Sequence, residues 1–330
     1  MKSAQIYCTT QELIQDLKLD GFDPTLWERI TAASRTIERE LGLYIPITDT
    51  KKFSGRGRSI LQIDPVLSIS KVLNYGVEIT DFTLLPETPP WANGPYSALQ
   101  ILTSWADTGV EITGSWGKYS ELRSLKVNGT IAAGATELVV ANGAKLSPGM
   151  VLLVEAEQLL VRAGAGSTDS PAPTAAISTL SAAIIDTDEA ITVTNGAEFF
   201  AGETLQIGVE DLYIRKINGN ELLVDRGWNQ TPADDHALGA AINVYRTYLV
   251  ERGMNGTTEI AHTNQLLSRY VPPEDVNWLC RQIAALMRMK AESGFSGRTG
   301  NAEIGEAGYY SEFPPNQIER VRNHYKLWVF

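Results

Sequence analysis

Cysteine and histidine are scarce in this chain, which has two cysteines and three histidines among 330 residues. The histidines stand far apart, outside any Cys-x-x-Cys or His-x-x-x-His pair: His236, His262 and His324. A zinc site needs three or four clustered ligands, so neither a metal nor a cofactor is expected. Cys8 and Cys280 lie far apart in the sequence, so only a chance meeting in the fold would pair them. Both are expected to be buried and reduced.

Long apolar runs are also missing. No stretch of about eighteen apolar residues is present, so neither a transmembrane helix nor a membrane partner is expected. The first residues, Met1-Lys2-Ser3-Ala4-Gln5, lack the apolar segment of a secretory signal, which predicts a protein made in the cytoplasm. The Asn-x-Thr sequences at Asn128, Asn229 and Asn255 are therefore interpreted as turns rather than glycosylation sites.

Basic residues are fewer than acidic residues. Lysine and arginine number 28 against 39 aspartates and glutamates, which gives a net charge of −11. Tight DNA binding needs clustered cations to replace counterions, so it is not expected, although a duplex could pass close by. The one compact basic segment could meet an acidic partner or phosphate: Lys51, Lys52, Phe53, Arg56 and Arg58. It lacks the Gly-Lys-Ser/Thr ending of a phosphate loop and is interpreted as a flexible loop.

Catalytic motifs are absent from the sequence as well. There is no Gly-x-Ser-x-Gly elbow, and no acid pair stands out among the 39 carboxylates. The chain is therefore not expected to be an enzyme, and a lyase or peptidase in its β-rich part is the least favoured alternative.

What the sequence does contain is a repeat. Asn142-Gly143-Ala144 recurs 53 residues later as Asn195-Gly196-Ala197, and the same spacing relates Glu157 to Glu210. The offset also takes Ile131 to Ile184, Gly149 to Gly202 and Arg162 to Arg215. Matches at one constant offset indicate a duplicated β unit.

Helix signals lie outside the repeat. Thr9-Thr10-Gln11-Glu12 has the form of a capping box, and Asp23-Pro24 is a strong start for a second helix. Apolar residues then follow at steps of three and four, and predict a buried stripe: Trp27, Ile30, Ser34, Ile37 and Leu41. A third helix is expected after Pro272-Pro273.

Short strands are expected between the second helix and the repeat, over 60–63, 71–75, 98–102 and 109–114. The chain ends in a glycine-rich segment and a last helix over about 316–327, flanked by aromatic residues. We interpret the last part as an arm for a partner: Tyr309, Tyr310, Phe313, Ile318, Val321, Tyr325, Trp328 and Phe330.

Together these signals predict an α+β fold, in which a helical core with short strands is interrupted by a β-rich inserted domain. The core is expected over 1–119 and 259–308, and the insert over 120–258. The insert would hold the two repeats, at about 125–162 and 178–246, and residues 309–330 would form the C-terminal arm.

The order of several short segments resembles the head–tail connector (portal adaptor) family of tailed phages. These segments are Tyr7-Cys8-Thr9-Thr10-Gln11-Glu12-Leu13, Ala32-Ala33-Ser34-Arg35-Thr36-Ile37-Glu38, Phe53-Ser54-Gly55-Arg56-Gly57, Ile60-Leu61-Gln62-Ile63-Asp64-Pro65-Val66-Leu67, the strand at Val72, Gly114-Ser115-Trp116-Gly117 and the helix after Pro272-Pro273. Family members are shorter, so the role of the insert does not follow from the resemblance.

The resemblance implies a structural virion protein at the head–tail junction. It would form a homo-oligomeric ring of about twelve subunits between the portal protein and a tail or stopper protein. Double-stranded DNA would pass through the lumen during packaging and ejection without specific binding. The arm would contact the portal, and the basic segment the tail or a neighbouring subunit.

The alternative is a tail-fibre or receptor-binding adhesin in which the β repeats bind carbohydrate. The segment Asp225–Thr231, followed by His236, resembles a turn-rich unit of phage structural proteins. It is interpreted first as a β-turn scaffold in which His236 packs or caps locally.

Overall fold

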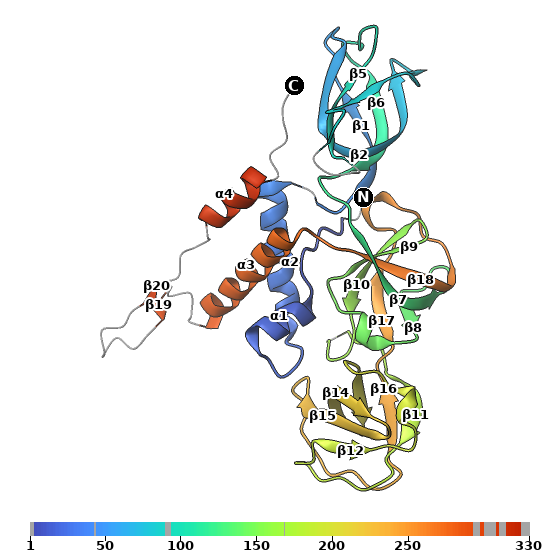
Figure 1. Ribbon diagram of the computed structural model, residues 1–330, viewed down its shortest axis with the longest axis vertical. Helices are drawn as coiled ribbons and strands as arrows, with labels where there is room; N and C mark the ends of the chain where they lie inside the picture. Colours follow the sequence, from blue (N-terminus) through green and yellow to red (C-terminus); the bar gives the residue numbers. More distant parts are fainter. Residues whose placement is uncertain are drawn as a thin grey trace.

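The computed structural model describes residues 3–42, 44–89, 94–167, 169–292, 298–299, 308–309 and 315–324. The chain is mostly β, with 40% strand and 20% helix, so the predicted α+β fold with a helical core was wrong. Many strands are short and rich in small residues, and their signals are weaker than those of the capped helices at the two ends. Four bodies can be followed in Figure 1: a helical unit, a sheet module, a barrel and a further β module.

The helical unit combines both ends of the chain. It contains α1 (Thr10–Leu17), α2 (Pro24–Leu41), α3 (Glu274–Glu292) and α4 (Pro315–His324). Thr9 and Glu12 form the expected capping box of α1, and Asp23 caps α2. One core holds side chains of all these helices together with Val151, Leu160 and Met254 from the barrel. The helices therefore pack on the barrel as well as on one another.

The buried face of α2 differs slightly from the predicted stripe. Leu26 and Ile30 are fully buried, whereas Trp27 is half-buried at the edge of the core. The Trp27 ring lies 4.6 Å from the guanidinium carbon of Arg162 in the barrel. Trp27 therefore joins the helix to the barrel rather than filling the helical core.

The sheet module follows α2. Its strands are β1 (Ile47–Phe53), β2 (Ile60–Asn74), β3 (Val77–Glu78), β4 (Thr83–Leu85), β5 (Tyr96–Gln100) and β6 (Val110–Trp116), paired in the order β1-β6-β2-β5-β4 with β3 beside β2. β2 spans both segments that were expected as separate strands. The pairing of β2 with β5 shifts register between Gln62 and Val66, and Pro65 lies at this shift. Strands tolerate proline at such irregular positions. Trp105 and Trp116 are fully buried in the module's own core.

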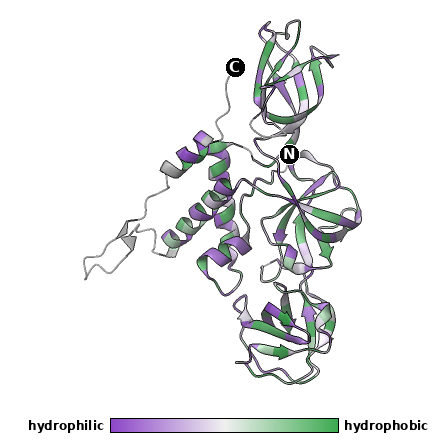
Figure 2. Cartoon of the chain, viewed as in Figure 1, coloured by the Kyte–Doolittle hydropathy of each residue, from purple (hydrophilic) through white to green (hydrophobic). Residues whose placement is uncertain are grey.

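The barrel is closed by strands that lie far apart in the sequence. Its members are β7 (Leu122–Ile131), β8 (Glu137–Val140), β9 (Val151–Val154), β10 (Glu157–Ala163), β17 (Thr247–Glu251) and β18 (His262–Tyr270). The boundary expected at residue 258 falls between β17 and β18, so the barrel runs past it to Tyr270. Figure 2 shows hydrophobic residues recurring in the strands of every β module, in keeping with a separate core in each.

A second six-stranded β module lies between β10 and β17. It consists of β11 (Thr174–Thr179), β12 (Ala190–Thr192), β13 (Thr204–Ile207), β14 (Glu210–Asn218), β15 (Glu221–Trp228) and β16 (Ala241–Val244). The order is β11-β16-β13-β14-β15-β12 here and β7-β18-β9-β10-β17-β8 in the barrel. If the six strands of each module are numbered along the chain, both modules pair them in the same order: first, sixth, third, fourth, fifth, second. We call this second module the inserted copy.

The repeat in the sequence is thus a nested duplication. Asn142 and Asn195 each cap a 3-10 turn, Gly143–Lys145 and Gly196–Glu198, through the same side-chain bond to a backbone N–H. Ile131 pairs with His262 in the barrel, and Ile184 pairs with His236 in the inserted copy. The barrel therefore carries, between its fourth and fifth strands, a six-stranded sheet with the same strand order.

Candidate functional site

The most conspicuous polar structures are two related turns, one in each β module. Arg252-Gly253-Met254-Asn255-Gly256-Thr257 follows β17, and Arg226-Gly227-Trp228-Asn229-Gln230-Thr231 occupies the end of β15 and the turn after it. A histidine stands ten residues after each arginine, at His262 and His236. We call these segments the barrel turn and the copy turn.

Both turns use left-handed backbone at matching positions. φ is +59° at Gly253 and +60° at Gly227, and it is +52° at Asn255 and +56° at Asn229. Glycine and asparagine tolerate this conformation best, which accounts for the shared Gly-x-Asn spacing.

Glu157 is the centre of the cluster in the barrel. Its carboxylate accepts bonds from Arg252 Nε at 2.9 Å and Nη2 at 2.6 Å, and lies 2.9 Å from His262 Nε2. The backbone N–H groups of Gly253 and Ile260 donate to it as well, each at 3.1 Å. Glu157 has no exposed surface. Every contact on this carboxylate therefore comes from within the chain.

Glu210 repeats this arrangement in the inserted copy. Arg226 donates to it from Nε at 2.7 Å and Nη2 at 2.8 Å, and His236 Nε2 lies 2.8 Å away. The backbone N–H groups of Gly227 and Asp234 donate at 3.0 and 3.3 Å. Glu210 has no exposed surface either.

The chemistry of these clusters is structural. Burial by itself would raise the pKa of Glu157, but the hydrogen bonds from Arg252, Ile260 and His262 outweigh it and hold the pKa below its usual range. The pKa of Glu210 is lowered in the same way against its burial, chiefly by Arg226. Both oxygens of each carboxylate are occupied, so neither is free to take a proton from a substrate. The arrangement holds the turns in place.

The asparagines of the two turns bind the N-terminal part of the chain. Asn255 Oδ1 accepts the backbone N–H of Ala4 at 2.8 Å, and its Nδ2 donates to Gln158 at 2.8 Å. In the inserted copy, Asn229 Oδ1 accepts the backbone N–H of Phe22 at 3.0 Å. Its Nδ2 donates to Asp211, the counterpart of Gln158, at 2.9 Å. Each β module thus binds a segment next to α1 through the asparagine of its turn.

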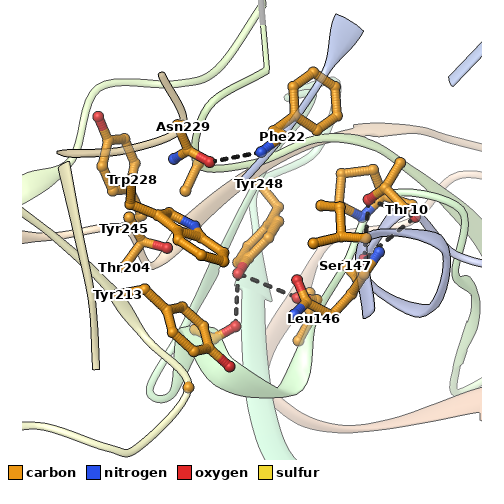
Figure 3. A pocket seen from close by; sticks show the side chains of 16 residues that line it. Thr10, Phe22, Leu146, Ser147, Thr204, Tyr213, Trp228, Asn229, Tyr245 and Tyr248 are labelled. Carbon is orange, nitrogen blue, oxygen red and sulfur yellow. Dashed lines mark hydrogen bonds between the residues drawn. The ribbon is translucent and has the colours of Figure 1, made fainter. Parts of the chain in front are cut away.

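A small cavity lies where three bodies meet (Figure 3). Thr10 comes from α1, Ser147 and Tyr248 from the barrel, and Tyr213 and Trp228 from the inserted copy. Its volume is about 60 Å³, room for a few water molecules. The rings of Tyr213 and Trp228 stack with centroids 4.6 Å apart. This junction is a packed contact between bodies rather than a substrate pocket.

A further buried ion pair ties the inserted copy to the barrel. Glu203 accepts from Arg246 Nε at 2.7 Å and Nη2 at 3.0 Å, and also from the backbone N–H of Gly143 at 2.9 Å. Glu203 is 1% exposed. Arg246 stands between β16 and β17, so this pair fixes the crossing point of the two modules.

The residues of the basic segment that was predicted to meet a partner lie in two places, in β1 and in the turn after it. Lys51 and Lys52 lie in β1 and pair with Asp64 at 2.7 Å and Glu111 at 3.0 Å. Phe53 packs beside Trp116, with ring centroids 5.7 Å apart. Arg56 and Arg58 lie in the exposed turn that follows. Within the segment, only these two arginines are presented on a turn.

The predicted C-terminal arm is described only in part. Val321 is 4% exposed and belongs to the helical core, and Ile318 packs against the same core. These two residues of α4 thus have a partner within their own chain, because α4 packs on α2 and α3. Tyr309 lies in β20 (Gly308–Tyr309), which pairs with β19 (Arg298–Thr299). Five arm residues lie outside the described residues: Tyr310, Phe313, Tyr325, Trp328 and Phe330.

The sequence predicts a turn at both Asn229 and Asn255, but only the copy turn was singled out together with its histidine. The signal was present, since Arg-Gly-x-Asn-x-Thr followed by histidine occurs twice, 26 positions apart. The interpretation of His236 as a local packing residue agrees with its bond to Glu210. His262 serves the same purpose in the barrel.

Among the described residues, no group of three or more histidine, cysteine, aspartate or glutamate side chains is placed to hold a metal ion. The helices in that part of the chain include none long and apolar enough to span a membrane. Comparison with known protein families, with curated proteins and with solved structures gave no match.

Proposed function

We propose that this protein is a structural component of a tailed-phage particle, an adaptor ring that joins the portal to the tail or a stopper protein. The observation that carries the proposal is the helical unit. Three of the seven segments that resemble the connector family belong to it, at α1, in α2 and in α3, and α3 packs against the other two although it comes from the far end of the sequence. The other four segments lie in the sheet module that follows α2.

The use of the buried charges supports a scaffold. Glu157, Glu203 and Glu210 are each saturated by an arginine and by backbone N–H groups of the same chain. Removing one partner of such a pair is costly, so these clusters hold the two turns and the crossing point of the two β modules in one conformation. A fixed conformation suits a structural subunit.

The charge balance supports passage of DNA without binding. A net charge of −11 repels the phosphate backbone, and a ring lined by like charge would let a duplex slide. The exposed Arg56 and Arg58 are a candidate contact with an acidic neighbour.

The proposal is tested by electron microscopy of the purified chain, alone and mixed with portal rings. Rings with cyclic symmetry that stack on the portal are expected. Failure to form rings in either sample, combined with affinity for bacterial surface glycans, would favour the adhesin alternative.

A further inference from the structure

Two thiols separated by most of the sequence meet in the helical core. Cys8 Sγ and Cys280 Sγ lie 3.2 Å apart. Cys8 belongs to the segment just before α1 and is 2% exposed, whereas Cys280 lies on α3 and is fully buried. Ser34 Oγ on α2 stands 3.4 Å from Cys280 Sγ. The pair sits where the start of the chain contacts its last third.

Hydrogen bonds next to the two cysteines hold the segment around Cys8 against α3. Asn277, one turn before Cys280 on α3, donates from Nδ2 to the carbonyl of Tyr7 at 2.8 Å. The same nitrogen donates to Glu12 at 3.0 Å, and Glu12 also closes the capping box with Thr9. An S–S bond is about 2.05 Å long, so the sulfurs need to approach by about 1.2 Å. Rotation of the two side chains about their Cα–Cβ bonds is the movement that would bring the sulfurs together.

We propose that Cys8 and Cys280 are a modification site, at which a low-molecular-weight disulfide such as oxidised glutathione converts the two thiols to an intramolecular disulfide. The bond would join the N-terminal segment to α3. It would close a loop that contains the sheet module, the barrel and the inserted copy.

The reaction is two successive thiol–disulfide exchanges. One cysteine, as thiolate, attacks a sulfur of oxidised glutathione, forms a mixed disulfide and releases one glutathione thiolate, which takes up a proton. The other cysteine loses its proton and attacks the protein sulfur of that mixed disulfide, releasing the second glutathione. The two protein thiols give up two electrons and two protons in all, and one oxidised glutathione becomes two reduced molecules.

Burial sets the rate of this conversion. Desolvation raises the pKa of the Cys8 thiol well above its ordinary value, so little thiolate exists at neutral pH. Oxidation should therefore be slow at pH 7 and faster at pH 9 or when mild denaturant loosens the N-terminal segment. The same burial would protect the finished bond from reductants.

The test uses the full chain, incubated folded with oxidised glutathione, then denatured and treated with an alkylating agent. Intact mass should show a loss of two hydrogens with no alkylation, and peptide mapping should link residue 8 to residue 280. The oxidised protein should unfold at a higher urea midpoint than the reduced protein, because the bond restricts the unfolded chain.

Two variants separate the pair from other effects. Cys8→Ser and Cys280→Ser should each lose the cross-link and the shift in midpoint between oxidised and reduced samples. The proposal is overturned if the wild-type chain, after long incubation under mild denaturant at pH 9, still alkylates at both thiols. A stable glutathione adduct on either cysteine, without the cross-link, overturns it as well.

Discussion

At the scale of single residues, two asparagines make equivalent hydrogen bonds in the two β modules. Asn255 and Asn229 each occupy a left-handed position, accept one backbone N–H from the N-terminal part of the chain and donate to one side chain of their own module. They differ in burial, since Asn255 has no exposed surface and Asn229 is half-buried. Asn255 should therefore matter more for stability.

Replacing Asn255 by glycine should destabilise the protein by about 1–3 kcal/mol, because the buried N–H of Ala4 loses its acceptor. Glycine keeps the left-handed backbone, so the loss reports the side chain. Asn264→Gly is the matched control, since Asn264 also has positive φ but is exposed. Urea denaturation measures both, and equal midpoints for the two variants would contradict the role given to Asn255.

Replacing Glu157 by glutamine should cost about 3–5 kcal/mol at pH 7, because Arg252 is left buried without its carboxylate. Glu189→Gln is the control, since the exposed ion pair of Glu189 with Arg215 is worth about 0–1 kcal/mol. Both are measured by urea unfolding.

The cost of Glu157→Gln should also depend on pH. The folded pKa of Glu157 is lowered, so its stabilisation is fully present above the unfolded value of 4.5 and is lost as pH falls through the folded pKa. The difference between wild type and variant should therefore shrink below pH 4.5. A difference that stays constant at lower pH would show that the charge of Glu157 is not what stabilises the turn.

At the scale of elements, the helices were the easier part to predict. The capping box of α1 and the Asp23-Pro24 start of α2 are local signals, and the structure contains both. The buried stripe of α2 was placed slightly off, because periodicity alone does not distinguish Leu26 from its neighbour Trp27.

The two positions give a prediction for α2. Ile30→Ala should cost about 2–5 kcal/mol, because Ile30 is fully buried. Trp27→Ala should cost about 1–2 kcal/mol, from partial burial and the contact with Arg162. Denaturation midpoints measured side by side test this, and a greater loss for Trp27→Ala would place that ring in the core.

The order of the strands shows why the nested arrangement of the two β modules was not predicted. The offset of 53 links only the first four strands of each module, since the fifth and sixth barrel strands come after the whole inserted copy. The barrel turn and the copy turn are instead 26 positions apart. A search at one offset therefore finds the repeat and misses the nesting. The contact between Cys8 and Cys280 was invisible for a related reason, since local patterns carry no information on such distant pairs.

At the scale of the whole molecule, nesting determines where the chain can be shortened. β10 and β17 pair antiparallel, with Ala163 opposite Leu249, so the points where the inserted copy leaves and returns are neighbours. Joining Gly164 to Arg246 through a short Gly-Ser linker should leave a soluble protein that unfolds cooperatively, as followed by circular dichroism.

A cut at the boundaries expected from the sequence is the control. Joining Ser120 to Thr258 removes β7 and β9, the two neighbours of β18, and should give an insoluble or non-cooperative chain. If the first variant fails to fold and the second folds, the inserted copy is not a separate module carried by the barrel.

The proposed ring on the portal is tested most directly by cryo-electron microscopy of the full chain mixed with purified portal rings. We expect a coaxial ring of about twelve copies in contact with the portal, with an open channel wide enough for a duplex. Particles in which the portal carries no added density, while the chain stays monomeric at the same concentration, would contradict it.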